Sequence, residues 1–112
     1  MKKAGKKSGN SAFQRVYALT ATIPAGKVAT YGQIAKRLGG LFSGRTVGFA
    51  MHAAPAEQNL PCHRVVNMKG EMAPGHVFGG AKRQRKMLRE EGVSFRRDGT
   101  VNLEKSLHRF DD

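Results

Sequence analysis

The sequence contains one cysteine, eight acidic residues and no long apolar run, and each shortage excludes a class of protein. A single cysteine cannot form an internal disulfide, so we expect a reducing compartment, the cytoplasm or the nucleoid. No apolar stretch approaches the roughly 20 residues that a spanning helix needs. The basic start is not followed by an apolar stretch, so no secretory signal is expected. A chain of 112 residues has room for one domain.

Positive charge is the property that this chain has in excess. Twenty lysine and arginine residues oppose eight acidic residues, which gives a net charge of +12 and a pI of about 10.6. In so small a body this charge favours a polyanionic partner, with nucleic acid first. An acidic membrane surface is disfavoured because no long amphipathic helix carries bulky apolar residues, and we expect no membrane partner. A basic surface kept only for solubility is the alternative.

The first half of the chain predicts a basic arm followed by short helices. Residues 1–11 are rich in Lys, Gly and Ser and predict a flexible arm, which leaves residues 12–112 as a single domain. Apolar spacing predicts a helix over residues 12–19, and a small strand is expected near residues 27–29. The segment Thr30-Tyr31-Gly32-Gln33 has the form of a capping box that opens a second helix, which ends at residues 39–40.

A third helix is predicted after Ser43, a suitable N-cap, with Val47, Ala50 and Met51 on its inner face. Two short helices joined by a glycine-bearing turn form the helix-turn-helix pattern. The second of them begins near Arg45, and recognition helices contact DNA through their N-terminal residues. Together with the charge, this pattern favours DNA binding. A helical hairpin that binds nothing is the alternative.

The second half predicts a mixture of short elements. Residues 61–66 indicate a loop that enters a short strand, and residues 67–80 are irregular and rich in glycine. A helix is expected over residues 81–91, with Met87 and Leu88 inward and basic side chains outward. Asp98-Gly99 predicts a hairpin turn, and Asn102 predicts the cap of a last short helix.

A cysteine beside a histidine is the chemically suggestive feature of this half. A water molecule could link the thiol of Cys62 to an imidazole and promote the thiolate, although neighbouring side chains in an extended segment point to opposite faces. A carboxylate would orient the histidine, His63. The candidates are Glu57, Glu71, Glu90 and Glu91. A buried cysteine beside a surface histidine is the alternative reading.

Metal binding is disfavoured by the spacing of the potential ligands. The residues that could bind zinc are Cys62, His52, His63, His76 and His108. They show no recognised ligand spacing, so we expect no metal, and nothing in the sequence indicates an organic cofactor.

Three segments together resemble the C-terminal domain of O6-alkylguanine-DNA alkyltransferases and their alkyltransferase-like relatives. They are TYGQIA at residues 30–35, GRTVG at residues 44–48 and PCHRV at residues 61–65. The resemblance covers residues 12–95. It implies a mainly α fold with a minor β part (α+β), a compact winged-helix-like helix-turn-helix domain whose recognition helix enters the minor groove of DNA.

The resemblance also implies roles for individual residues. Cys62 is similar to the cysteine that accepts the alkyl group irreversibly, His63 to the histidine that activates it through water, and Glu91 to the glutamate that orients this histidine. Arg45 is similar to the finger that replaces the flipped nucleotide, and Tyr31 to the tyrosine that crowds the 3′ phosphate. The residues expected at DNA are Tyr31, Gln33, Ser43, Arg45, Thr46 and Arg64, and those expected around the lesion are Pro61, Val65, Phe78 and Gly79.

Departures from the repair enzymes leave two hypotheses open. Ala54 stands where the enzymes usually have a hinge asparagine, Phe78 where they usually have a serine, and the chain has no counterpart of their N-terminal domain. Alkyltransferase-like proteins share these departures but usually lack the cysteine at position 62. The chain is therefore expected to be either a single-turnover methylated-DNA–protein-cysteine methyltransferase or a non-catalytic sensor that recruits nucleotide excision repair. A generic basic helix-turn-helix module with a structural cysteine is the third reading.

Under both main hypotheses the expected partner is double-stranded DNA that contains O6-alkylguanine. We expect a monomer, because no oligomer seam is visible in the sequence.

Overall fold

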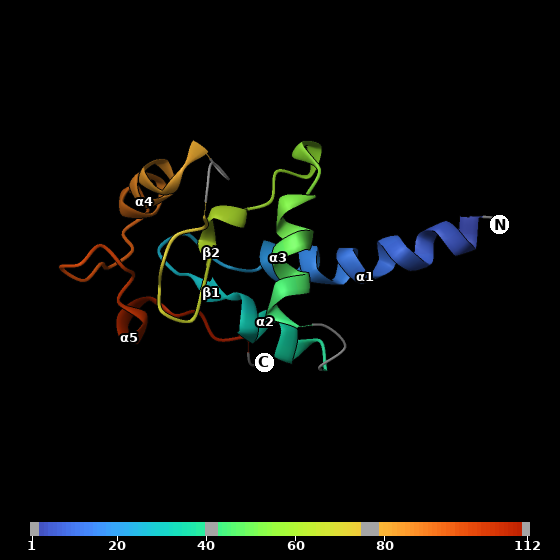
Figure 1. The fold of residues 1–112 in the computed structure, drawn as a ribbon, viewed down its shortest axis with the longest axis horizontal. Coiled ribbons are helices and arrows are strands. Elements are labelled where there is room, and N and C mark those ends of the chain that lie inside the picture. The colour runs from blue at the N-terminus through green and yellow to red at the C-terminus, as the bar shows by residue number, and fades with distance from the viewer. Residues whose placement is uncertain (1–2, 40–42, 75–78, 111–112) are drawn as a thin grey trace.

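The computed structural model describes residues 3–39, 43–74 and 79–110. The elements are α1 (Lys3–Ala21), β1 (Ala29–Thr30), α2 (Tyr31–Arg37), α3 (Gly44–His52), the 3₁₀ turns Ala56–Gln58 and Cys62–Arg64, β2 (Val65–Val66), α4 (Ala81–Glu90) and α5 (Leu103–Ser106). Figure 1 shows α1, α2 and α3 on one side of the two short strands and α4 and α5 on the other. This mainly helical architecture with a small sheet confirms the predicted fold class.

The sheet has two parallel strands and divides two apolar cores. Ala29 pairs with Val65 and Thr30 with Val66. Because side chains alternate along a strand, Ala29 and Val65 belong to the core formed with α1, α2 and α3, whereas Val66 belongs to the core formed with α4. Cys62, just before β2, is a member of the first core.

The first helix begins earlier than the spacing of its apolar residues predicted. The backbone is helical from Lys3 rather than from Ala12, so the segment predicted as an arm overlaps the first turns of α1. The division into an arm and a domain stays a prediction. At its other end α1 is joined to α3, because the hydroxyl of the buried Tyr17 donates to the carbonyl of Ala50 at 2.8 Å.

The helix-turn-helix and its caps are confirmed. The Oγ1 atom of Thr30 accepts from the amide of Gln33, and the Gln33 side chain accepts from the amide of Thr30 at 2.7 Å. Ser43 caps α3 through the amide of Thr46 at 3.2 Å. The helix α2 ends at Arg37, two residues before the predicted stop. The predicted inner residues of α3, Val47, Ala50 and Met51, are buried.

The elements after β2 also follow the local sequence signals. Leu88 of α4 is fully buried as predicted, whereas Met87 is only half-buried. Gly92 follows the helix with a φ of +93°, the left-handed conformation that glycine adopts without strain. Asn102 caps α5 through the amide of Glu104. Within the described part of the chain, no helix is both long and apolar enough to cross a bilayer.

Candidate functional site

Cys62 lies in a 3₁₀ turn that leads into β2, in agreement with the predicted loop before a short strand. Pro61 precedes the turn, and the amide of Arg64 donates to its carbonyl at 2.9 Å. Both Cys62 and His63 line one pocket, whereas neighbours in an extended segment would point to opposite faces. Val65, the first residue of β2, is buried behind the turn.

The pocket has a volume of about 510 Å³ and lies between the C-terminal end of α3 and α4. Its lining comprises Met51, His52, Ala54, Pro55, Ala56, Asn59, Leu60, Cys62, His63, Arg83 and Met87. Ala54, which stands at the hinge position of the resemblance, is thus part of the wall. Arg83 and Met87 come from α4 and were not predicted as site residues.

The carboxylate that contacts the histidine is that of Glu91. Its Oε2 atom lies 2.9 Å from Nε2 of His63. The three other candidates lie elsewhere: Glu71 accepts from Asn67, Glu90 from Lys86, and Glu57 is exposed in the 3₁₀ turn after α3. The structure therefore selects Glu91, at the C-terminal cap of α4, from the four candidates.

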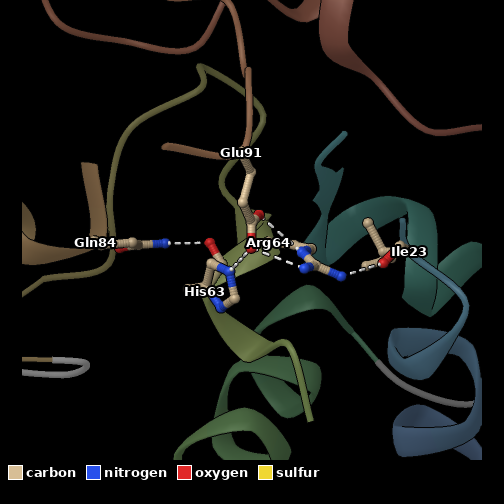
Figure 2. A network of polar contacts seen from close by, with 5 residues as sticks. All are labelled: Ile23, His63, Arg64, Gln84 and Glu91. Atoms are coloured by element: carbon tan, nitrogen blue, oxygen red, sulfur yellow. Dashed lines mark hydrogen bonds and ion pairs between the residues drawn. The ribbon is translucent and has the colours of Figure 1, made fainter. Parts of the chain in front are cut away.

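Arg64 makes two hydrogen bonds to the same carboxylate. Its Nε donates to Oε1 of Glu91 at 2.9 Å and its Nη2 to Oε2 at 2.7 Å, while Nη1 donates to the carbonyl of Ile23 at 2.8 Å. Figure 2 shows this network, with the guanidinium between Glu91 and Ile23. The guanidinium thus links the segment that follows α1 to the C-terminal end of α4, and a DNA contact by Arg64 stays a prediction.

Gln84 holds the backbone of His63, whereas Glu91 holds its ring. Gln84 was not predicted from the sequence as a site residue. It is fully buried in α4. Its Nε2 donates to the carbonyl of His63 at 2.9 Å (Figure 2), and its Oε1 accepts from the amide of Ala73 at 2.8 Å. Its polarity suggested a solvent-facing residue, but its position four residues before Leu88, on the same face of the helix, was the signal that could have found it.

The electrostatics of the pocket hold the resting thiol in its protonated form. Burial raises the pKa of Cys62 to about 11. For Glu91 the direction is opposite: hydrogen bonds from Arg64 lower its pKa most, partial burial opposes them, and the contact with His63 lowers it further. An ionised carboxylate only accepts, so Nε2 of His63 carries the hydrogen of this contact, and in the tautomer that this leaves for a neutral imidazole Nδ1 is the proton acceptor.

A second cavity of about 550 Å³ adjoins the first. Its lining comprises Tyr31, Gly44, Arg45, Gly48, Phe49, Met51, His52, Ala73 and Pro74. Met51 and His52 line both cavities, so the two meet at the C-terminal end of α3. Tyr31 and the exposed Arg45, which the resemblance placed at DNA, thus face one groove. Burial raises the pKa of Tyr31, and the proximity of Cys62 raises it further.

The other predicted DNA contacts have structural roles of their own. The side chain of Gln33 caps α2 and also donates to the carbonyl of His108 at 2.8 Å. Ser43 and Thr46 take part in the cap of α3. Contacts of these three residues with DNA stay predictions.

The predicted lesion loop is described only in part. Phe78 and His76 lie outside the described residues. Gly79, with a φ of +83°, lines a cavity on α4 together with Lys82, Arg83, Arg85, Lys86, Arg89 and Glu90. The predicted basic outer surface of α4 is confirmed. Among the described residues, no three histidine, cysteine or acidic side chains are grouped to hold a metal ion.

These features together define a small helix-turn-helix domain with a pocket beside α3 that is lined by Cys62 and His63, and Glu91 holds this histidine. Residues 11–93 match the family described as the DNA-binding domain of 6-O-methylguanine DNA methyltransferase. The match covers well over half of the sequence. The chain therefore belongs to this family.

Individual relatives divide between the two branches that the sequence suggested. The chain is 41% identical over 81 residues to alkyltransferase-like protein 1 of Schizosaccharomyces pombe, which covers 72% of this chain and 75% of that protein. It is 42% identical over 86 residues to a methylated-DNA–protein-cysteine methyltransferase of Shigella flexneri, which covers 76% of this chain but only 49% of that protein. The chain thus spans about half the length of that methyltransferase.

A solved structure supports the same relationship in three dimensions. Atl1 of S. pombe, in complex with damaged DNA containing O6-carboxymethylguanine, matches with a TM-score of 0.75 and 34% identity. The match covers 89% of this chain and 96% of that chain.

Proposed function

We propose that this protein binds duplex DNA carrying O6-alkylguanine, extrudes the damaged nucleotide and transfers its alkyl group to Cys62. The observation that carries the proposal is the pocket shared by Cys62 and His63, in which His63 is already held by Glu91. The methyltransferase of S. flexneri and the DNA-bound structure of Atl1 support the same substrate class. The net charge of +12 supplies attraction to the phosphate backbone.

Extrusion of the nucleotide is a steric requirement of the reaction. The O6 atom of a stacked guanine is inaccessible to a protein nucleophile, so the base leaves the stack at a cost of a few kcal/mol. Arg45, exposed near the start of α3, fills the gap, and Tyr31, beside it in the same groove, presses on the neighbouring phosphate. The extruded base then reaches the adjoining pocket that contains Cys62.

The transfer step is a displacement at the alkyl carbon. The thiol proton of Cys62 passes through a water molecule to Nδ1 of His63, and Glu91 stabilises the resulting imidazolium. The sulfur then bonds to the alkyl carbon, and the bond between that carbon and O6 breaks with its electron pair on guanine. The proton held by His63 returns to the guanine. The thioether is stable, so each protein molecule reacts once.

Because the pKa of the Cys62 thiol is raised, the reaction needs a general base, and His63 is placed to act as one. With a pKa of about 11, Cys62 is protonated at neutral pH and unreactive on its own. The thiolate therefore forms only when His63 removes the proton in the presence of a bound base. Such a resting state protects a single-use acceptor from other electrophiles.

The test is the intact mass of the protein after incubation with a short duplex containing O6-methylguanine. We expect a gain of one methylene, about 14 Da by atomic mass, in the wild-type protein and none in Cys62→Ala. His63→Ala should bind the same duplex but gain mass more slowly, because the general base is absent. An unmodified wild-type protein after excess lesion DNA would overturn the transfer step.

A second candidate function is that of a sensor that binds the lesion without repairing it and recruits nucleotide excision repair. The likeness to alkyltransferase-like protein 1 and the burial of Cys62 favour it. In the same experiment a sensor would show preference for lesion duplex over undamaged duplex with no mass gain. Equal affinity for both duplexes would exclude the sensor as well.

A further inference from the structure

The helix α3 has an outer face that its own fold does not use. Val47, Ala50 and Met51 are buried on the inner side of the helix. The remaining stripe, at spacings of three and four, consists of Arg45, Gly48, Phe49 and His52, and all four line the groove that contains Tyr31.

Phe49 is the unexpected member of this stripe. It is 62% exposed, and it belongs to neither apolar core. Among the described residues, the other exposed large apolar side chain is Met68, at 80%, in the turn after β2. Most of the ring stays in contact with solvent, so its contribution to folding is smaller than that of a core phenylalanine. Together with Tyr31, Met51 and Pro74 it lines the groove, and a groove with an apolar wall fits a partner that offers an apolar or aromatic surface.

Gly48, directly before Phe49, indicates that the partner comes close to the helix backbone. Apart from its chain neighbours and the backbone of its own helix, a Cβ atom placed on Gly48 would have no atom within 4 Å, so packing inside this chain does not require a glycine. Glycine weakens the interior of a helix. The absent side chain lowers the helix surface beside Phe49, which lets a bulky partner approach while the ring projects beyond it.

We propose that Phe49 is an apolar wedge that inserts between base pairs of the DNA bound by α3. The inference rests on the DNA-binding part of the proposed function. Duplex DNA is the partner that the surface fits, because Arg45 lies one turn earlier on the same stripe, α3 has no acidic residue, and the chain carries a net charge of +12. Apolar side chains inserted at a base step unstack it and kink the duplex.

The spacing along the helix suits two insertions into one duplex. Four residues of α-helix rise about 6 Å, and successive nucleotides of one strand are about 3.4 Å apart. With Arg45 in the gap of the extruded nucleotide, Phe49 therefore reaches a base step about two positions away. The wedge would hold the duplex open on one side of the lesion and lower the cost of extrusion.

The experiment compares Phe49→Ala with the wild-type protein on one duplex, with and without O6-methylguanine. Affinity is measured by fluorescence anisotropy at several salt concentrations, and bending by energy transfer between dyes at the duplex ends. We expect Phe49→Ala to bind about tenfold more weakly and to bend the duplex less. Its salt dependence should equal that of the wild type, because no charge is lost.

Two further variants control the interpretation. Met68→Ala removes the other exposed apolar side chain and should leave affinity and bending unchanged. Phe49→Leu keeps an apolar wedge without a ring and should lie between the wild type and Phe49→Ala. Because Phe49 is exposed, these changes are expected to leave the thermal unfolding of the protein unaltered.

The results separate the wedge from the proposed function. Wild-type affinity and bending in Phe49→Ala would overturn the wedge and point to a protein partner for this face. A wild-type protein that does not distinguish lesion duplex from undamaged duplex would overturn the proposed function. The comparison of Phe49→Ala on undamaged duplex would still decide the wedge.

Discussion

The Nε2 atom of His63 lies 2.9 Å from Oε2 of Glu91, although 28 positions separate the two residues in the sequence. The histidine is in the turn before β2, and the glutamate caps the end of α4. Their contact therefore depends on how α4 docks on the sheet, which Leu88 and Gln84 determine from inside. The orientation of the proposed general base is a property of tertiary packing.

Glu91→Gln should reduce stability because Arg64 loses an ionised partner. At pH 7 we expect the free energy of unfolding to fall by about 1–2 kcal/mol, a modest value since both side chains are about a fifth exposed. Urea denaturation measures it. Glu90→Gln, which removes a well-exposed ion pair with Lys86, is the matched control and should change stability by less than about 0.5 kcal/mol. Equal effects of the two variants would contradict the network.

Glu91→Gln also tests how the stability of the folded protein depends on pH. The pKa of Glu91 is lowered in the folded protein, so its contribution is present above the ordinary value of 4.5 and is lost as pH falls through the folded value. Wild-type stability should therefore decline more steeply below pH 4.5 than that of Glu91→Gln. If the free energies of unfolding of the two proteins fell in parallel below pH 4.5, the partners of Glu91 would not lower its pKa.

The reactivity of Cys62 should report its raised pKa. With a pKa of about 11, the rate of alkylation by iodoacetamide should rise about tenfold per pH unit from pH 7 to 10 without a plateau. In urea the rate should level off near the ordinary thiol value of about 8.5. Mass spectrometry of the protein, with Cys62→Ser as a blank, follows the reaction. A plateau below pH 9 in the folded protein would contradict the effect of burial.

Gln84→Leu tests the support behind the histidine. The substitution leaves the carbonyl of His63 and the amide of Ala73 without their partner in a buried place, so we expect a loss of about 2–3 kcal/mol in the free energy of unfolding. Amide exchange at Ala73 should accelerate. Gln58→Leu, at an exposed glutamine, is the control. Unchanged protection of Ala73 would mean that Gln84 does not hold this segment.

Arg45→Ala should weaken binding to lesion duplex and lower the slope of log affinity against log salt concentration by about one. The matched control is Arg97→Ala, which removes the same charge from an exposed position in the segment between α4 and α5. Tyr31→Phe should have a smaller effect than Arg45→Ala, because the aromatic body remains in the groove. Fluorescence anisotropy titrations measure the affinity of each variant for lesion duplex. Equal losses of affinity in Arg45→Ala and Arg97→Ala would contradict the role of Arg45 as a finger.

Elements whose signals lie within a few residues were predictable. The capping box of Thr30 and Gln33, the N-cap at Ser43 and the glycine stop at Gly92 each depend on neighbours three or four positions apart. The inner face of α3 followed from helical spacing alone. Element bounds were less secure, as the earlier start of α1 and the 3₁₀ turn at Cys62–Arg64 demonstrate.

Contacts between distant segments were not predictable from spacing. By spacing alone four glutamates were equivalent orienters, and Glu91 was implied only by the resemblance; the packing of α4 on the sheet brings Glu91 to His63. The same packing directed Arg64 to Glu91 and Ile23 and buried Gln84. Periodicity assigns residues to faces, but it contains no information on which faces meet.

The sequence by itself determined the class of this protein: one small basic domain, a helix-turn-helix, and a cysteine–histidine motif at a recognisable distance from Arg45. Chain length and net charge follow from composition alone, and the helices and their caps depend on residues only a few positions apart, so both can be inferred without the fold. Only the tertiary structure decided the state of the thiol, the contact of Glu91 with His63, and the exposure of Phe49 beside Gly48. Each of these depends on burial and on distances between segments that become neighbours only when the chain folds.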